Sequence, residues 1–212
     1  MKSFSSPEIL FEDDHIIVCR KPSGIPTQSS RIGTPDMVSI LKNHIGNHPW
    51  IAVIHRLDQP VEGILVFAKT KKAAADLNRQ LTSSGFGKYY LAVTENKPAA
   101  TEGTLTDYLV KDGRTNMSRV CSGETQGAKK AVLHYEFCGS CQGGYLIRIH
   151  LDTGRHHQIR VQMSHMGCPL VGDRKYGSPS STGQLMLCAY KLEFRHPVTR
   201  KQMCFEIHDF PH

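Results

Sequence analysis

Residues 51–69 of the chain read IAVIHRLDQPVEGILVFAK, and they place a charged segment between two apolar runs. The runs at 51–54 and 63–68 have the length of β-strands, and the second is apolar throughout, which is typical of a strand covered on both faces. Pro60 and Gly63 make the connection irregular, because both residues interrupt a strand ladder. We therefore predict that His55-Arg56-Leu57-Asp58 lies on a loop between two strands.

The rest of the chain reads as short strands with a few helices. A helix is predicted over residues 35–45, with Thr34 as the N-cap and Pro35 at the first helical position. A second helix carries Ala74, Leu77 and Leu81 on one face, and a third is predicted over roughly 155–166. Further strands are predicted at 16–20, 88–94, 145–151, 185–194 and 203–207. Because strands and helices do not alternate regularly, we predict an α+β fold with a mixed, largely antiparallel sheet flanked by helices and loops.

The chain has 212 residues, of which 39% are hydrophobic and 21% are charged. We expect one domain over residues 1–212, since a chain of this length can bury its own core. No apolar run approaches the ~20 residues of a membrane span, and the N-terminus lacks an apolar signal core. We therefore expect a cytoplasmic protein with no membrane partner. The seven cysteines are scattered through apolar stretches, which predicts reduced, buried thiols rather than disulfides.

The net charge is +7, with tight basic runs at residues 69–72 and 129–130. A basic excess is compatible with a polyanionic partner, because each neutralised phosphate releases condensed counterions. Many basic proteins bind no nucleic acid, so the charge permits RNA or DNA without demonstrating either.

Two clusters contain residues that could carry chemistry. In the first, Asp58 lies beside cationic side chains on a loop, where neighbouring positive charge keeps a carboxylate ionised and nucleophilic. A surface ion pair of no consequence would look the same. The second cluster comprises residues 154–160, GRHHQIR, whose arginines and histidines near a helix N-terminus resemble an anion-binding surface. A solvated helix face is an equally good interpretation of the second cluster.

Several motifs, in order along the chain, resemble the RluA family of pseudouridine synthases. The first is the HRLD segment followed by Gly63-Ile64-Leu65-Val66-Phe67-Ala68-Lys69. The others are Lys88-Tyr89-Tyr90-Leu91-Ala92, Gly154-Arg155-His156-His157-Gln158-Ile159-Arg160-Val161, Gly172-Asp173 and Tyr176-Gly177, with Glu12-Asp13-Asp14, Lys21-Pro22-Ser23-Gly24 and His196-Pro197 near the two ends. The resemblance spans nearly the whole chain.

The resemblance implies the pseudouridine synthase fold and conversion of selected uridines in ribosomal or transfer RNA to pseudouridine, without cofactor or metal. It implies that Asp58 is the catalytic aspartate and that Tyr90 stacks on the base and is a candidate for moving the C5 proton. Arg160 is then the basic partner of the aspartate, and Arg56 helps to extrude the target nucleotide. We also expect RNA contacts from His55, Arg155, Gln158, Lys71 and Lys72.

The chain departs from the family pattern at a few positions. Val61-Glu62 stand where Thr-Ser is usual, so Glu62 adds a negative charge four residues from Asp58. His156, Gln162 and Cys188 replace a usual Thr and two common histidines. The small S4-type RNA-binding domain of many relatives is not expected, and we expect a monomer whose partner is a structured RNA.

Two alternatives remain. A catalytically inactive RNA-binding module could use the same scaffold, although Asp58, Tyr90 and Arg160 are all retained. A zinc-dependent base deaminase is suggested by His134 and Glu136 followed by the Cys138–Cys141 pair. Its two halves are normally far apart in sequence and on helices, so we expect no metal site here.

Overall fold

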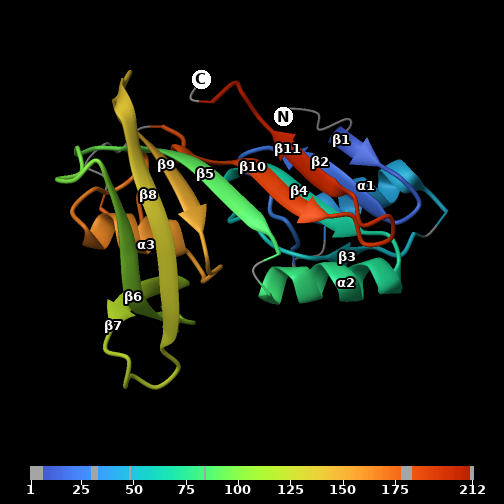
Figure 1. Ribbon diagram of the computed structural model, residues 1–212, viewed down its shortest axis with the longest axis horizontal. Coiled ribbons are helices and arrows are strands. Elements are labelled where there is room, and N and C mark those ends of the chain that lie inside the picture. The colour runs from blue at the N-terminus through green and yellow to red at the C-terminus, as the bar shows by residue number, and fades with distance from the viewer. Residues whose placement is uncertain (1–6, 30–32, 48, 84, 178–182, 211–212) are drawn as a thin grey trace. The chain divides into compact units, whose positions relative to one another are not determined.

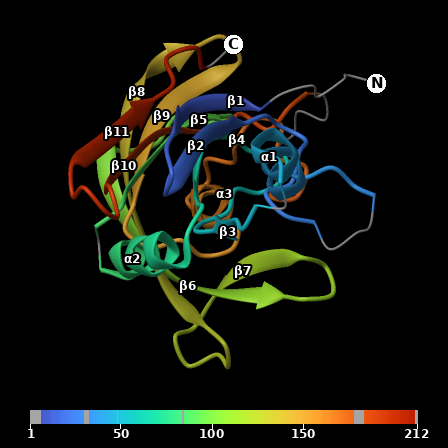
Figure 2. The same cartoon turned by 90° about the vertical axis from the view of Figure 1, so that its right-hand side faces the viewer.

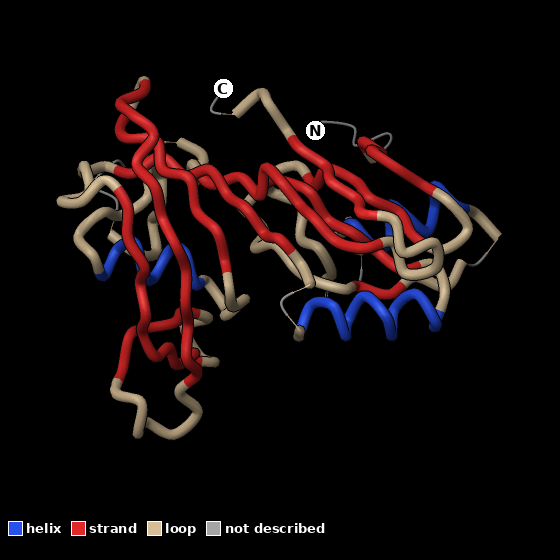
Figure 3. Tube along the Cα trace, viewed as in Figure 1, coloured by secondary structure: helices blue, strands red, loops and turns tan. Residues whose placement is uncertain are grey.

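The computed structural model describes residues 7–29, 33–47, 49–83, 85–177 and 183–210. The chain divides into two compact units, which are residues 1–87 with 189–208 and residues 88–188 with 209–212. Strands β5 and β10 each cross a boundary between the units along the chain. In each unit, more residues lie in strands than in helices (Figure 3). The single domain expected from the sequence stays a prediction.

The first unit contains a sheet with the strand order β1-β2-β4-β10, in which β11 pairs with β10 and β3 pairs with β4 (Figure 1). Its strands are β1 (Glu8–Glu12), β2 (Ile16–Lys21), β3 (Ala52–Val53), β4 (Glu62–Ala68), β10 (Leu187–Arg195) and β11 (Gln202–Glu206). Its helices are α1 (Met37–Ile45) and α2 (Lys71–Thr82), and α2 packs against β4. Every residue of β4 is buried, which confirms the prediction of a strand covered on both faces.

Gly63 permits the close approach of two strands in this unit. A Cβ atom on Gly63 would overlap the backbone of Ala189, the first residue of β10 that belongs to this unit. The backbone φ of Gly63 is +134°, which other residues rarely adopt. Glycine at this position therefore lets β4, the strand that follows the Asp58 loop, pack closely against its neighbour β10.

The second unit contains a fully antiparallel run of strands in the order β5-β9-β8-β6-β7. These strands are β5 (Gly87–Thr94), β6 (Glu102–Asp112), β7 (Met117–Cys121), β8 (Lys129–Cys141) and β9 (Gly144–Leu151). Helix α3 (Gln158–His165) contacts β6 and β7, which form a hairpin (Figure 2). Leu109, Ala131 and Val161 form a core cluster between the strands and α3.

Two predicted helix starts are wrong. Helix α1 begins at Met37 because Asp36 is the N-cap, and its carboxylate accepts a hydrogen bond from the backbone N–H of Ser39 in a capping box. Helix α3 begins at Gln158 rather than near 155, because His157 adopts the left-handed conformation with φ of 55°. The α+β class with a mixed, mostly antiparallel sheet is confirmed.

The cysteines only partly follow the expected pattern. All seven are free thiols, and Cys19, Cys168 and Cys188 are buried. Cys138 and Cys204 are exposed, which corrects the expectation of buried cysteines throughout. Both lie on strands whose residues alternate between exposed and partly buried positions, so their side chains fall on the open side.

Within the described part of the chain, no helix has both the length and the apolar character needed to cross a membrane.

Candidate active site

The HRLD segment lies on the loop between β3 and β4, as predicted. Leu57 is buried, with 6% of its surface exposed, while Asp58 is half-buried and Arg56 is exposed. The His55 ring accepts a hydrogen bond from the backbone N–H of Val66 in β4, at 3.4 Å. The loop is therefore bound to the buried strand at its first residue.

The segment at residues 22–27, which follows β2, fixes the backbone on both sides of Asp58. The buried hydroxyl of Thr27 accepts a hydrogen bond from the Leu57 N–H at 3.1 Å and donates one to the Leu57 carbonyl oxygen at 3.0 Å. On the other side, the hydroxyl of Ser23 donates to the carbonyl oxygen of Pro60 at 2.8 Å. Residues 57 and 60 are thus held by side chains from one short segment.

Lys21, the last residue of β2, is a buried cation with 0% of its surface exposed. Its ammonium group donates hydrogen bonds to the carbonyl oxygens of Pro22 at 3.0 Å, Ile25 at 2.6 Å and Gln59 at 3.0 Å. The Gln59 carbonyl also accepts a hydrogen bond from the Gly24 N–H at 2.9 Å. An ammonium group has three donors, and here each has a backbone acceptor.

Burial dominates the electrostatics of Lys21. Desolvation lowers the pKa of Lys21 to about 8, although the negative charges of Asp58 and Glu62 act in the opposite direction. Lys21 therefore places a positive charge under the Asp58 loop at neutral pH and can lose it in mildly alkaline solution.

The unusual Glu62 is buried beside cationic groups. Its carboxylate lies 3.8 Å from the guanidinium of Arg20, which also lies 3.9 Å from Glu8. The carboxylate also interacts with the charge of Lys21. The negative charge that departs from the family pattern is therefore compensated by two cations of β2.

Lys71 and Lys72 are exposed in the first turn of α2, and Thr70 is its N-cap. This turn contains no acidic residue. Cations at the positive end of a helix dipole are unfavourable, by about 0.3–1 kcal/mol each at exposed positions. Their placement therefore makes a small unfavourable contribution to the stability of the helix.

Tyr90 lies on β5 opposite Ile149 of β9, and 8% of its surface is exposed. Cross-strand pairing fixes the direction of the ring relative to the sheet. The tyrosine is thus held by a regular strand rather than by a loop.

Arg160 is buried in α3 and forms a bidentate ion pair with Asp173. Its Nε and Nη2 donate to the two carboxylate oxygens at 2.8 and 2.7 Å, and the side chains are 6% and 0% exposed. The guanidinium also lies 5.1 Å from the ring centre of Tyr176. The orientation of Arg160 is therefore fixed by two residues of the segment that follows α3.

Tyr176 is itself held by hydrogen bonds from three directions. Its hydroxyl accepts from the Ser118 N–H at 2.8 Å and bonds to Nδ1 of His157 at 2.7 Å. Its carbonyl oxygen accepts from the Ser164 hydroxyl at 2.6 Å. The network connects β7, the start of α3 and the segment around Tyr176.

Arg155 and Gln158 differ in exposure. Arg155 is exposed, and its Nε donates to the carbonyl oxygen of Lys130 at 2.8 Å. Gln158 is 3% exposed, and its amide oxygen accepts from the Thr153 hydroxyl at 2.8 Å and the Arg155 N–H at 2.9 Å. Its amide nitrogen donates to the carbonyl oxygen of Val132 at 3.0 Å. Gln158 thus holds the loop that presents Arg155.

The first unit brings His55, Arg56 and Asp58 together on one loop, and the second contains Tyr90, Arg155, Gln158 and Arg160. The expected pairing of Arg160 with Asp58 stays a prediction.

Five residues that position these groups were not given roles from the sequence, namely Lys21, Ser23, Thr27, Asp173 and Tyr176. All except Thr27 lie in motifs that carry the family resemblance, which was the available signal. Their burial and partners could not be read from those motifs.

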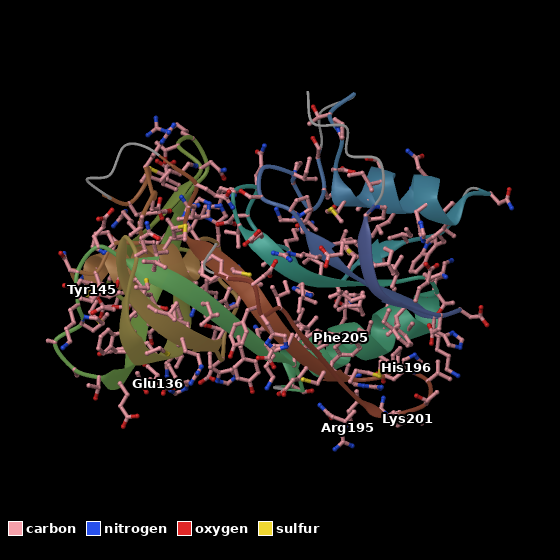
Figure 4. All side chains as sticks on the ribbon, turned by 90° about the horizontal axis from the view of Figure 1, so that it is seen from above. Glu136, Tyr145, Arg195, His196, Lys201 and Phe205 are labelled. Atoms are coloured by element: carbon pink, nitrogen blue, oxygen red, sulfur yellow. The ribbon has the colours of Figure 1, made fainter. Side chains whose placement is uncertain are left out.

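The residues of the deaminase interpretation are not arranged for zinc-dependent base chemistry. Glu136 extends from β8 into the open and pairs with Arg148 at 2.7 Å (Figure 4). Among the described residues, Cys138 and Cys141 do not belong to any group of three closely spaced metal-ligand atoms. His134 belongs instead to a group with His150 and Asp152, which contains no cysteine.

Comparison with known proteins agrees with the motifs. The family model described as RNA pseudouridylate synthase matches residues 15–165. The uncharacterized RNA pseudouridine synthase YhcT of Bacillus subtilis is 34% identical over 199 residues, which cover 91% of this chain and 65% of that protein. The dual-specificity RNA pseudouridine synthase RluA of Escherichia coli is 31% identical over 215 residues, which cover 97% of each.

A solved structure described as human RNA pseudouridylate synthase domain containing 4 has the same fold, with a TM-score of 0.77 over 95% of this chain and 88% of that one, at 23% identity. The chain spans just under two thirds of the length of the Bacillus subtilis relative. The family match covers well over half of the 212 residues. This chain therefore belongs to the RNA pseudouridylate synthase family.

Proposed function

We propose that this chain is an isomerase that converts selected uridines of a structured RNA, ribosomal or transfer, to pseudouridine. Membership of the family supports this reaction. The observation that carries the proposal is the fixed backbone around Asp58, which Thr27, Ser23 and Lys21 hold at residues 57, 59 and 60. Such positioning is what a carboxylate needs to act on one atom of a bound nucleotide.

The reaction breaks the N-glycosidic bond of a uridine, turns the uracil without releasing it, and joins C5 to C1′. Asp58 is the proposed catalytic residue, and its carboxylate either attacks C1′ or takes the 2′ proton. Either role requires the ionised form, because a protonated carboxyl group is neither a nucleophile nor a base.

The remaining residues are proposed to serve the base and the RNA backbone. Tyr90 offers a ring for stacking on the detached uracil and a hydroxyl near which the C5 proton can move. Arg160 is the proposed basic partner of the aspartate, and Arg56 is proposed to help extrude the nucleotide, a step that costs a few kcal/mol in a duplex. RNA contacts are proposed for the remaining expected residues, His55, Arg155, Gln158, Lys71 and Lys72.

Replacement of Asp58 by asparagine tests the proposal. The Asp58→Asn variant should keep its fold and most of its RNA affinity but form no pseudouridine, because the amide is a poor nucleophile and base. The matched control is Glu136→Gln, the same chemical change at an exposed carboxylate, which should leave activity unchanged. Pseudouridine mapping of total RNA from cells with and without the gene identifies the substrate RNA to be used in the assay.

The outcomes distinguish the alternatives. Turnover of Asp58→Asn close to that of the unmodified protein would remove Asp58 from the mechanism. If the unmodified protein binds RNA and yields no pseudouridine at any mapped position, the chain is an inactive RNA-binding module.

A further inference from the structure

Four side chains from four neighbouring strands lie in one row across the second unit. Tyr89 of β5 is the register partner of His150 of β9, His150 is the partner of His134 of β8, and His134 is the partner of Thr104 of β6. Register partners in a sheet project from the same face, with Cβ atoms about 5 Å apart. Asp152 lies two residues after His150, so it continues on that face.

The two histidines and the aspartate are in mutual contact. Nε2 of His134 lies 3.0 Å from Oδ2 of Asp152, and Nδ1 of His150 lies 3.7 Å from Oδ1 of the same carboxylate. The three potential ligand atoms all lie within 4.8 Å of one another. Among the described residues, this is the one group of three or more such side chains.

The two distances from the histidine nitrogens to the Asp152 oxygens are close to the distance between two ligands of one metal ion. A tetrahedral zinc ion with ligands at about 2.0–2.1 Å separates those ligands by roughly 3.3–3.4 Å. The distances from Nε2 of His134 to Oδ2 of Asp152 and from Nδ1 of His150 to Oδ1 of Asp152 are 3.0 and 3.7 Å, on either side of that value. Two imidazoles and a carboxylate are a donor set that suits zinc and neighbouring divalent transition metals.

We propose that His134, His150 and Asp152 form a binding site for a divalent transition-metal ion of the zinc class. The side chains are 46%, 38% and 44% exposed, so water can complete the coordination. None of the three ligands is among the residues proposed for the reaction, and the site goes beyond the proposed isomerase activity, which requires no metal.

The rings are held in place before a metal arrives. His150 stacks on Tyr89 with ring centres 4.8 Å apart, and on His134 with centres 5.9 Å apart. The backbone N–H of Asp152 donates to the carbonyl oxygen of Val132. Because the ligands lie on paired strands or directly after one, binding restricts little additional conformational freedom.

His134 also has a partner of the kind that orients metal ligands. Its Nδ1 lies 2.9 Å from the hydroxyl of Thr104, which can donate or accept. When that hydroxyl accepts from Nδ1–H, the lone pair of Nε2 points at the ion, and such second partners are a regular feature of histidine ligands. Asp152 would then exchange its hydrogen bond with His134 for a bond to the metal.

The other histidine–carboxylate pairs among the described residues lack this third ligand. His165 lies 3.4 Å from Asp107, and His208 lies 3.8 Å from Glu206. His165 is in the second unit and is 58% exposed, and its pair with Asp107 has one imidazole and one carboxylate but no second imidazole. It therefore provides a matched control.

The test is a titration of the purified chain with Co²⁺, followed by visible absorption. We expect one Co²⁺ per chain, a spectrum without a thiolate charge-transfer band, and displacement by Zn²⁺, which binds such sites more tightly. Asp152→Asn and His134→Gln should each weaken Co²⁺ binding by about tenfold or more, since even second partners of ligands change affinity by 10–100-fold. His165→Gln should bind Co²⁺ like the unmodified chain.

Asp152→Asn changes no volume and keeps an oxygen that can accept from His134, so circular dichroism should show an unchanged fold. Tight binding by Asp152→Asn, or the absence of a one-to-one site in the unmodified chain, would overturn the proposal. A thiolate band would also overturn it, because it would assign the ion to the exposed cysteines. A melting temperature that rises with Zn²⁺ in the unmodified chain and not in Asp152→Asn would support it.

Discussion

The ammonium group of Lys21 lies 3.0 Å from the carbonyl oxygen of Gln59, the residue that follows the proposed catalytic Asp58. The lysine side chain is completely buried, and its other two donors are bonded to Pro22 and Ile25. Lys21 is therefore a positioning residue, because it connects β2 to the backbone of the Asp58 loop. It also supplies positive charge near Asp58 and Glu62.

The lowered pKa of Lys21 predicts a specific dependence of stability on pH. Between a folded-state pKa of about 8 and the ordinary value of 10.5, the unfolded chain holds more of the Lys21 proton than the folded chain does. The free energy of unfolding contributed by this site therefore rises with pH in that window and is lost as pH falls through 8. The full difference is of order 3 kcal/mol.

We expect the stability of the unmodified chain relative to Lys21→Met to increase from pH 8 to pH 10, measured by urea unfolding at fixed ionic strength. Burial raises the pKa of Cys19 to about 12, which acts in the opposite direction, but both proteins contain Cys19 and the difference cancels it. A stability difference that stays flat over this range would show that Lys21 titrates as an exposed lysine does.

Much of this architecture could be predicted from local sequence. The run at 63–68 is continuously apolar, and it is the buried strand β4. The Lys21-Pro22-Ser23-Gly24 segment carries part of the family resemblance, but nothing in its sequence distinguishes a buried lysine from an exposed one. That distinction depends on carbonyl oxygens of residues 25 and 59, which only the folded chain brings to the ammonium group.

The helix boundaries failed for a similar reason. Thr34-Pro35 is a good N-terminal signal, yet Asp36 and Ser39 form the capping box two residues later. Residues 155–157 continue the helical pattern of α3 in sequence, but Arg155 is held by the buried amide of Gln158 and His157 is left-handed. In both places, side-chain to backbone hydrogen bonds override the periodicity.

Asp173 should be essential for stability as well as for the orientation of Arg160. We expect Asp173→Asn to lower the free energy of unfolding by about 3–5 kcal/mol, because it removes the carboxylate that forms a bidentate ion pair with the buried guanidinium of Arg160. The matched control is Glu136→Gln, which breaks an ion pair of the same 2.7 Å length at an exposed site and should cost about 1 kcal/mol or less. Equal effects of the two changes, measured by urea unfolding, would contradict the role assigned to burial.

Removal of the Tyr90 hydroxyl tests its proposed part in the reaction. Tyr90→Phe keeps the stacking ring, so RNA affinity should change little while turnover falls by about 10²–10⁴-fold if the hydroxyl moves the C5 proton. Tyr108→Phe, at an exposed tyrosine of β6, should leave turnover unchanged. The measurement is single-turnover pseudouridine formation, and a normal yield from Tyr90→Phe would assign the proton transfer to another group.

The first turn of α2 places two lysines where a helix favours negative charge, and no acidic residue accompanies them. Lys42, in contrast, lies in the last turn of α1, where a positive charge is favourable. The two helices therefore offer the same substitution in opposite electrostatic settings.

Replacement of Lys71 and Lys72 by glutamine should accordingly separate stability from RNA binding. We expect the double variant to be slightly more stable, by about 0.3–1 kcal/mol per residue, because the helix dipole no longer opposes two cations. It should bind substrate RNA more weakly, and the slope of log affinity against log salt should flatten by roughly 0.7–0.9 for each phosphate that is no longer neutralised. The modified uridine should stay the same, since phosphate contacts position the RNA without reading its sequence.

The Lys42→Gln control should instead lose a little stability and keep the salt slope. An unchanged slope in the Lys71 and Lys72 variant would remove both residues from the RNA-binding surface, and a change of modified uridine would show that they select the substrate.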